Sequence, residues 1–274
     1  MSNLMNLKDR TAVVTGAASG IGRAIAVSLA RRGCHLALAD VNEERLLETR
    51  QLVSGNGIRL SLHRVDVGDR GEVMNFPQAV AAEHSGVDIL VNNAGVALGG
   101  TFDETSEEDF EWLFGINFWG VVRMTRAFLP LLRMSDDARL VNLSSLYGLI
   151  APPGQTAYSA SKFAVRGFSN ALRHELAGTH IGVTVVHPGG VATSIVENAR
   201  VAKGASAERI AQRRAAAKRA LRLPPAVAGE IIVKGVERRE PRIIVGTDAK
   251  AISLLERLAP VSYWNILARL LRSA

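Results

Sequence analysis

Residues 11–22, which read "TAVVTGAASGIG", place a short run rich in β-branched residues directly before three glycines. The run is typical of a buried strand, and the periodicity of residues 21–32 predicts a helix immediately after the turn. A helix that begins at such a turn directs free backbone N–H groups outward, where they bind a pyrophosphate well. The alternative is a turn that only packs a helix onto a sheet.

The same order of strand and helix continues along the chain. Apolar strands separated by helices predict a parallel sheet covered on both faces. Right-handed crossovers then give a doubly wound α/β fold with seven parallel strands. We find no linker and no repeat, so we expect a single domain over 1–274. The expected strands are 11–15, 35–39, 58–65, 87–91, 139–143, 181–186 and 242–245, and the expected helices are 21–32, 43–53, 72–84, about 105–132, 157–178 and 225–238.

Composition narrows the class of protein. Hydrophobic residues make up 47% of the 274 residues and charged residues 22%, so a sizeable core forms and disorder is not expected. A single cysteine, Cys34, excludes an intrachain disulfide and argues against a metal site. No apolar run reaches the roughly 18 residues of a membrane span. Lys8, Asp9 and Arg10 precede any long apolar stretch, unlike a secretory signal, so a cytoplasmic protein is predicted.

The net charge of +7 is concentrated in one segment, 203–222, where seven basic residues and one acid account for +6. The segment lacks the interleaved aromatic residues that stack on bases, so no nucleic-acid partner is expected. It either attracts an acidic substrate or forms a solvated amphipathic helix, and we favour the helix. The basic residues are Lys203, Arg209, Arg213, Arg214, Lys218, Arg219 and Arg222.

Asp40 stands at the end of the second expected strand, 18 residues after Gly22. A carboxylate there can accept hydrogen bonds from a ribose 2′-hydroxyl and repels a 2′-phosphate. The alternative is an ordinary helix cap. Arg23 and Arg45 are the nearest cations that could serve NADP. The sequence therefore favours NAD, with NADP as the alternative.

Residues 142–165, "NLSSLYGLIAPPGQTAYSASKFAV", carry a second constellation. Tyr158 and Lys162 are four residues apart on an expected helix and share one face. A neighbouring cation lowers the pKa of a phenol from about 10, which makes a usable general acid/base. Ser145 follows a strand and can orient a carbonyl oxygen, although Ser144 is the alternative because alternation allows only one of them.

Several ordered motifs together resemble the short-chain dehydrogenase/reductase family, over residues 7 to about 246. They are TGxxxGxG at 15–22, "DV" at Asp66 and Val67, NNAG at 92–95, Asn117 in "GINFWG", Ser145, YxxxK at 158–162, and Pro188-Gly189 with Thr193. The resemblance implies a Rossmann-type fold and an NAD(P)-dependent oxidoreductase that interconverts a secondary alcohol and a ketone.

The resemblance also implies a role for each site residue. Tyr158 exchanges a proton with the substrate oxygen, and Lys162 holds the nicotinamide ribose and lowers the pKa of the tyrosine. Ser145 positions the substrate, and Asn117 holds a water molecule of a proton relay. The implied cofactor-binding residues are Gly16, Ser19, Gly20, Ile21, Gly22, Asp40, Asp66, Val67, Asn93, Ala94, Gly95, Tyr158, Lys162, Pro188, Gly189, Val191 and Thr193.

Purely structural roles remain as alternatives for individual residues. Asn117 could only hydrogen-bond within its helix, Asn92 could only stabilise the central sheet, and Thr193 could only cap the next helix. For the whole chain, the alternative is a non-catalytic nucleotide-binding or scaffold protein. The presence of Ser145, Tyr158 and Lys162 together argues against that alternative.

Two segments lie outside the motifs. The family implies that 194–223 forms a lid over the substrate, and that subunits join as homo-oligomers, dimers or tetramers, through helices near 106–132 and 157–178. The apolar tail 248–274 covers the pocket, joins subunits or lies on a membrane, and we favour the first two. An apolar small-molecule substrate is expected, of steroid, long-chain or hydroxyacyl type.

Overall fold

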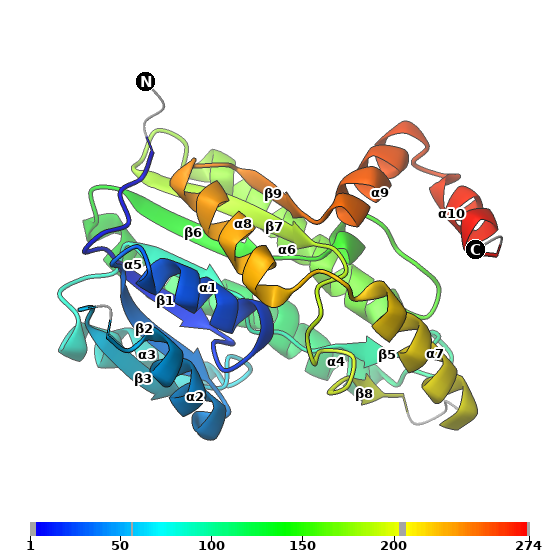
Figure 1. The fold of residues 1–274 in the computed structure, drawn as a ribbon, viewed down its shortest axis with the longest axis horizontal. Coiled ribbons are helices and arrows are strands. Elements are labelled where there is room, and N and C mark those ends of the chain that lie inside the picture. The colour runs from blue at the N-terminus through cyan, green and yellow to red at the C-terminus, as the bar shows by residue number, and fades with distance from the viewer. Residues whose placement is uncertain (1–3, 56, 203–206, 273–274) are drawn as a thin grey trace.

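The computed structural model describes residues 4–55, 57–202 and 207–272. Seven parallel strands form one sheet in the order β3-β2-β1-β4-β6-β7-β9, with helices on both faces (Figure 1). The doubly wound fold is therefore confirmed. The strands are β1 Thr11–Thr15, β2 His35–Asp40, β3 Leu60–Arg64, β4 Ile89–Asn92, β6 Ala138–Leu143, β7 Ile181–Pro188 and β9 Arg242–Val245.

The helices divide between the two faces because successive side chains of a strand point in opposite directions. In β1, Ala12 and Val14 face a core that includes the apolar sides of α1 and α8, and Val13 faces a core that includes α3 and α5. The α-helices are α1 Gly20–Ala30, α2 Glu43–Val53, α3 Arg70–Glu83, α4 Glu107–Phe114, α5 Gly120–Met134, α6 Thr156–Glu175, α7 Ala207–Ala220, α8 Pro225–Glu237, α9 Thr247–Leu258 and α10 Tyr263–Arg272.

Two helices differ from expectation. The predicted helix at 105–132 starts after a cap at Ser106, but a π-helical segment, Gly115–Trp119, separates α4 from α5. Such a turn adds one residue to the helix locally and is frequent at functional sites. The helix α3 starts at Arg70, ahead of the predicted residue 72, because Asp69 accepts a hydrogen bond from the Glu72 backbone and caps it.

Residues 194–223, the expected lid segment, contribute one strand to a second, small sheet that the sequence did not reveal. Its strands are β5, Leu98–Gly99, and β8, Arg200–Val201, which pair in parallel. Lys203 of the basic segment lies outside the described residues, as do the side chains of Arg209 and Arg213. The described basic side chains of α7 are exposed, as a solvated helix requires.

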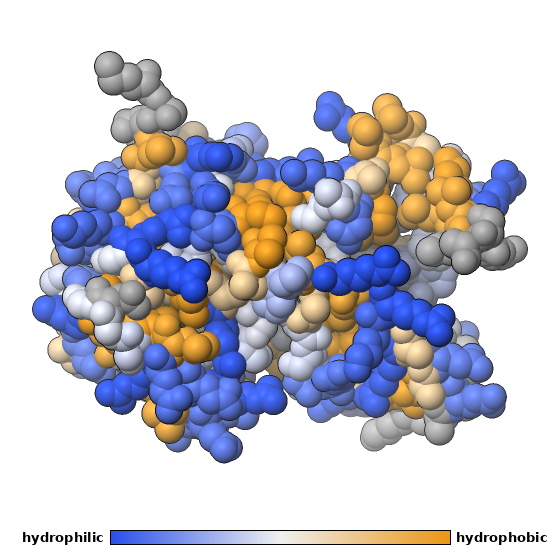
Figure 2. All heavy atoms as spheres, viewed as in Figure 1, coloured by the Kyte–Doolittle hydropathy of each residue, from blue (hydrophilic) through white to orange (hydrophobic). Residues whose placement is uncertain are grey.

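The tail helices α9 and α10 pack one side onto the loop at 146–151 and leave the other side exposed. Ile252, Tyr263 and Leu267 join the cluster of that loop, and the Tyr263 hydroxyl accepts a hydrogen bond from the Ala151 backbone at 2.9 Å. Apolar residues gather on the outer side of the tail, at the upper right of Figure 2. They include Leu254, Leu258, Val261 and Leu270. Within the described ranges, no helix combines the length and apolar character needed to cross a membrane.

A buried polar chain ties the centre of the sheet to its helices. Asn92 Nδ2 donates to Asn142 Oδ1 at 2.9 Å and to Thr125 Oγ1 at 3.2 Å. Asn142 Nδ2 in turn donates to Ser169 Oγ at 3.0 Å. These bonds link β4 and β6 to α5 and α6, so Asn92 has the structural role that the sequence left as an alternative.

Replacing Asn142 by alanine should lower the free energy of unfolding by about 1–3 kcal/mol, because the Asn92 amide and the Ser169 hydroxyl stay buried and lose a partner. Urea unfolding followed by circular dichroism measures the change. Gln51→Ala, on the exposed side of α2, is the control and should change stability by less than about 0.5 kcal/mol. Equal stability of the two variants would contradict the role of the polar chain.

Candidate active site

The carboxyl ends of β1 and β4 are joined by side-chain contacts. The Thr15 hydroxyl accepts hydrogen bonds from the backbone N–H groups of Asn93, at 3.0 Å, and Ala94, at 3.1 Å. Asn93 Nδ2 donates back to the carbonyl oxygens of Thr15, at 2.9 Å, and Gly16, at 3.1 Å. The NNAG motif therefore fixes the position of the glycine turn.

The glycine turn is closely packed and presents the start of α1. Gly16 has a φ of +65°, and a Cβ on Gly22 would lie 2.1 Å from the Gly16 carbonyl oxygen. Ser19 precedes the helix without a side-chain capping bond. Thr193 lies against the turn, since its Cγ2 would be 3.0 Å from a Cβ on Gly20. The first N–H groups of α1 and the nearby hydroxyls suit a pyrophosphate.

Asp40 connects the end of β2 to the glycine turn. Its Oδ2 accepts a hydrogen bond from the Ala18 backbone at 3.0 Å, and its Oδ1 accepts one from the Asn42 backbone at 3.1 Å. The cap of α2 is Asn42, whose side chain accepts from the Arg45 backbone. Asp40 is therefore not the helix cap, and each of its oxygens keeps capacity for another donor.

Arg23, one of the two cations that could serve NADP, is already engaged. Its guanidinium pairs with Glu48 at 2.6 Å and donates to Thr49 Oγ1 at 3.0 Å. It also donates to the Ala18 carbonyl oxygen. These contacts hold its charge against α2, while the side chain of Arg45 is exposed.

Asp66 and Val67 lie directly after β3. Asp66 Oδ1 accepts a hydrogen bond from the Gly68 backbone at 2.8 Å. Val67 is buried against Gly120 at the start of α5, where a Cβ would lie 3.0 Å from Val67 Cγ2. Both residues shape the loop at the carboxyl edge of the sheet next to Asp40.

Tyr158 and Lys162 lie buried on the inner face of α6. Lys162 Nζ is 5.7 Å from the centroid of the Tyr158 ring and donates to the Leu143 carbonyl oxygen at 3.1 Å. The Ser145 side chain lies beside Tyr158, where it acts to lower the pKa of the phenol. Ser144 donates instead to the Lys162 carbonyl oxygen at 2.8 Å. Of the two candidate serines, Ser145 is the one that meets the tyrosine.

Burial dominates the acid–base properties of this pair. It raises the pKa of Tyr158 to about 12, although Ser145 acts in the opposite direction. Burial also lowers the pKa of Lys162 to about 8. The lysine donates its hydrogen bond to the Leu143 carbonyl, and its expected effect on the pKa of the phenol stays a prediction.

Asn117 sits in the π-helical segment and holds the loop after the NNAG motif. Its Oδ1 accepts from the Val96 backbone N–H at 2.8 Å, and its Nδ2 donates to the Val96 carbonyl at 3.0 Å and to Ser161 Oγ at 3.3 Å. The side chain thus bonds outside its own helix, and only Oδ1 has capacity left for a water molecule. Gly95 lies between Asn117 and Lys162, so the motif and α6 meet here.

The end of β7 also lies at the carboxyl edge of the sheet. Pro188 is its last residue, and Gly189 N–H donates to the Val245 carbonyl at 2.9 Å. Val191 is buried and bridges to Leu223 at the far end of the lid segment. These contacts place Val191 and Thr193 where the lid segment begins.

Sequence reasoning missed His187 as a supporting residue. It is fully buried, and its Nδ1 donates to the Ser145 carbonyl oxygen at 2.9 Å. Burial lowers the pKa of His187 to about 4, so the ring is neutral and the carbonyl selects the Nδ1–H tautomer. The signal in the sequence was a histidine directly before "PGG", in a strand that is otherwise apolar.

The surroundings of Tyr158 are apolar. The ring of Tyr147 lies edge-on to it at 6.1 Å, and Leu98, Leu113 and Trp112 belong to the same cluster. Arg200 of β8 stacks over Trp112 at 3.9 Å and pairs with Asp109 at 3.1 Å. The lid segment is thereby fastened to α4 beside the apolar cluster.

Comparison with known proteins identifies the family of the chain. The family model for short chain dehydrogenases matches residues 10–204. The chain is 42% identical to the putative oxidoreductase SadH of Mycobacterium tuberculosis over 270 residues, which cover 97% of this chain and 96% of the relative.

Two solved structures share the fold. A short-chain dehydrogenase/reductase from Burkholderia phymatum in complex with NAD aligns with a TM-score of 0.86 at 30% identity, covering 93% of this chain and 95% of that one. The alcohol dehydrogenase of Thermococcus sibiricus complexed with 5-hydroxy-NADP aligns with a TM-score of 0.69 at 27% identity, covering 87% and 96%. The chain belongs to the short-chain dehydrogenase/reductase family, whose members are NAD(P)-binding oxidoreductases.

Proposed function

We propose that the protein interconverts a secondary alcohol and a ketone with NAD, using Tyr158 as the general acid/base. The observation that carries this proposal is the contact between the Ser145 side chain and Tyr158, with Lys162 on the same helix face. All three side chains lie at the carboxyl edge of the sheet, where open α/β sheets bind ligands. The glycine turn is at the same edge.

The residues present suit a dinucleotide. The start of α1, with Ser19 and Gly20, would hold the pyrophosphate, and Asp40 would hold the adenosine ribose. When bound, the nicotinamide supplies the hydride chemistry. The other residues proposed to contact it are Gly16, Ile21, Gly22, Asp66, Val67, Asn93, Ala94, Gly95, Tyr158, Lys162, Pro188, Gly189, Val191 and Thr193.

The chain's own groups handle the proton. With a pKa of about 12, Tyr158 is a neutral phenol near pH 7, which is the form that donates a proton to a substrate oxygen. Ser145 holds that oxygen beside the phenol. Lys162, with a pKa of about 8, is mostly protonated near pH 7, and two of its N–H donors remain beyond the one given to Leu143. Its charge offsets the cost of a transient phenolate.

The apolar cluster around Tyr158 supports an apolar substrate, because charged groups would lose hydration there. A homo-oligomer is supported by exposed aromatic residues on the helices expected to join subunits. Trp119 precedes α5 and is 49% exposed, and Phe163 of α6 is 38% exposed. The non-catalytic alternative is less favoured, since a purely binding protein has no need of the Ser145–Tyr158 contact.

Replacing Tyr158 by phenylalanine should lower turnover at least about 100-fold, because the proton donor is lost. Oxidation of NADH in the presence of ketones, followed by absorbance, measures the rate. Dinucleotide affinity and melting temperature should stay near those of the native protein. Tyr147→Phe is the control and should keep most of the turnover. Similar rates for both variants would reject the role of Tyr158, and binding without turnover by the native protein would favour the non-catalytic alternative.

Asp40 should set the preference between the two dinucleotides. We expect kcat/KM to be at least about tenfold higher with NAD than with NADP, because a carboxylate repels a 2′-phosphate across a short distance. Asp40→Ser should lower this ratio, mainly because kcat/KM with NAD falls. Glu43→Gln, an exposed acid in the first turn of α2, is the charge-matched control and should leave the ratio unchanged. A native protein that prefers NADP would contradict the proposal.

The burial of Lys162 should lower the free energy of unfolding near pH 7. Burial lowers its pKa from 10.5 to about 8, so the unfolded chain binds more protons between these values and stability rises with pH across that window. A shift of one pKa unit corresponds to about 1.4 kcal/mol. Lys162→Met should therefore raise the free energy of unfolding at pH 7 by up to about 3 kcal/mol, minus the contribution of the lost hydrogen bond to the Leu143 carbonyl.

Urea unfolding at pH 7 and pH 10 tests this expectation. The difference in the free energy of unfolding between Lys162→Met and the native protein should be smaller at pH 10 than at pH 7. Turnover by the variant should be lost at both pH values. Lys250→Met, at an exposed position of α9, is the control and should show no such pH dependence. A destabilised Lys162→Met at pH 7 would show that the hydrogen bond outweighs desolvation.

A further inference from the structure

Arg139 is a buried arginine near the start of a strand of the central sheet. It is the second residue of β6 and is only 9% exposed. Its Nε has no hydrogen-bond partner, and within the described part of the chain no hydrogen bond or ion pair is found for the rest of its guanidinium, although the charges of Asp137 and Arg239 act on it. A buried cation without a partner is unfavourable, and such groups in native proteins commonly have a functional reason.

The neighbouring strand makes room for this guanidinium. Arg139 is paired in register with Gly182 of β7. A Cβ on Gly182 would lie 1.7 Å from Arg139 Nη1, so any other residue there would displace the side chain. The sequence thus combines a buried arginine with the one residue type that accommodates it.

The guanidinium lines a surface pocket of about 570 Å³ at the amino ends of β6 and β7. Residues 176–183, which join α6 to β7, form one wall. The charged and titratable residues of the lining are Asp136, Asp137, Arg139, Arg173, His180 and Arg239.

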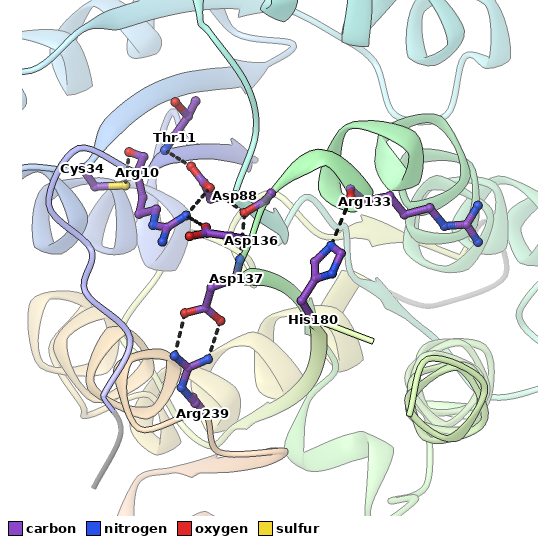
Figure 3. A network of polar contacts seen from close by, with 10 residues as sticks. Arg10, Thr11, Cys34, Asp88, Arg133, Asp136, Asp137, His180 and Arg239 are labelled. Atoms are coloured by element: carbon purple, nitrogen blue, oxygen red, sulfur yellow. Dashed lines mark hydrogen bonds and ion pairs between the residues drawn. The ribbon is translucent and has the colours of Figure 1, made fainter. Parts of the chain in front are cut away.

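The other charged groups of the pocket are already paired, as Figure 3 shows for most of them. Asp137 binds Arg239 through both carboxylate oxygens, one of them at 2.6 Å from Arg239 Nη2. Asp136 pairs with Arg10, which also binds Asp88 at 2.9 Å.

Arg173 and His180 are held by acceptors of the main chain. Arg173 donates to the Val183 carbonyl at 3.0 Å and to the Pro241 carbonyl at 2.6 Å. His180 Nε2 donates to the Arg133 carbonyl at 3.1 Å. Among the described cations of the pocket, Arg139 is therefore the one whose N–H donors are left for a ligand.

We propose that this pocket binds a small oxyanion, the carboxylate or phosphate group of a metabolite, on Arg139. A planar guanidinium matches such groups with two parallel hydrogen bonds. The ligand would supply a directly bonded negative partner, which the described residues do not provide, because Asp137 binds Arg239 instead. The site does not depend on the proposed function.

The pocket is separate from the catalytic edge. Strand β6 runs from Ala138 to Leu143, and Ser145 follows two residues later. At roughly 3.3 Å per residue, Arg139 and Ser145 are about 20 Å apart along the strand. A ligand on Arg139 therefore binds outside the space proposed for the dinucleotide and its substrate.

Thermal unfolding tests the proposal with inorganic phosphate and acetate as probes. The native protein, saturated with NAD so that the pyrophosphate position is filled, should melt several degrees higher in phosphate, acetate or both than in sodium chloride of equal ionic strength. A response to phosphate alone identifies a phosphorylated ligand, and a response to acetate identifies a carboxylate.

Arg139→Met should melt at or above the native temperature in sodium chloride and should lose the response to the oxyanions. Arg238→Met, at the exposed neighbour of Arg239, is the control and should keep the response. Arg139→Gln gives the same readout if the methionine variant does not fold. The proposal is overturned if the native protein responds no more to oxyanions than to chloride, or if the Arg139 variants keep the full response.

Discussion

The contacts between Thr15, Asn93 and Gly16 join the two strands at which the order of the sheet reverses. From β1 the chain runs outward through β2 and β3 and then returns to β4 on the other side of β1. A crevice opens at such a reversal because consecutive loops leave in opposite directions. The Thr15 hydroxyl and the Asn93 amide fix its floor, so both the glycine turn and the loop that Asn117 holds depend on them.

The groups proposed to react illustrate a conflict between stability and chemistry. Tyr158 and Lys162 are both buried, and burial disfavours the charged form of each. In the proposed reaction, these shifts would suit donation of a proton to a substrate oxygen. The apolar cluster that causes these shifts is also the surface that an apolar substrate would contact.

Much of the fold could be predicted because local patterns and tertiary packing agree. The bounds of α2, β1 and β9 match the prediction, and the other strands differ from it by at most two residues at either end. Sequence could not show the small sheet of β5 and β8, whose strands are two residues each and depend on pairing across the lid. It also could not show that Arg139 is left unpaired, since this depends on Asp137 binding Arg239 instead.

The candidate site was predicted at the level of residues but not of contacts. Strand alternation left Ser144 and Ser145 open, and only the position of α6 separates them. The roles expected for Lys162 and Asn117 came from motif resemblance, which carries no information on how deeply the groups are buried or which backbone atoms they bind. His187 was missed because its partner is a carbonyl 42 residues away in the chain.

The π-helical segment Gly115–Trp119 has a consequence for how this stretch can change in length. Each residue of an α-helix turns the chain by about 100°, but the wider turn absorbs one surplus residue, so the buried sides of α4 and α5 stay on one face. Deleting a single residue there would restore a regular α-helical turn and would leave Met124, Phe128 and Leu132 in the core. The stretch should therefore accept a single deletion more readily than α4 or α5 themselves.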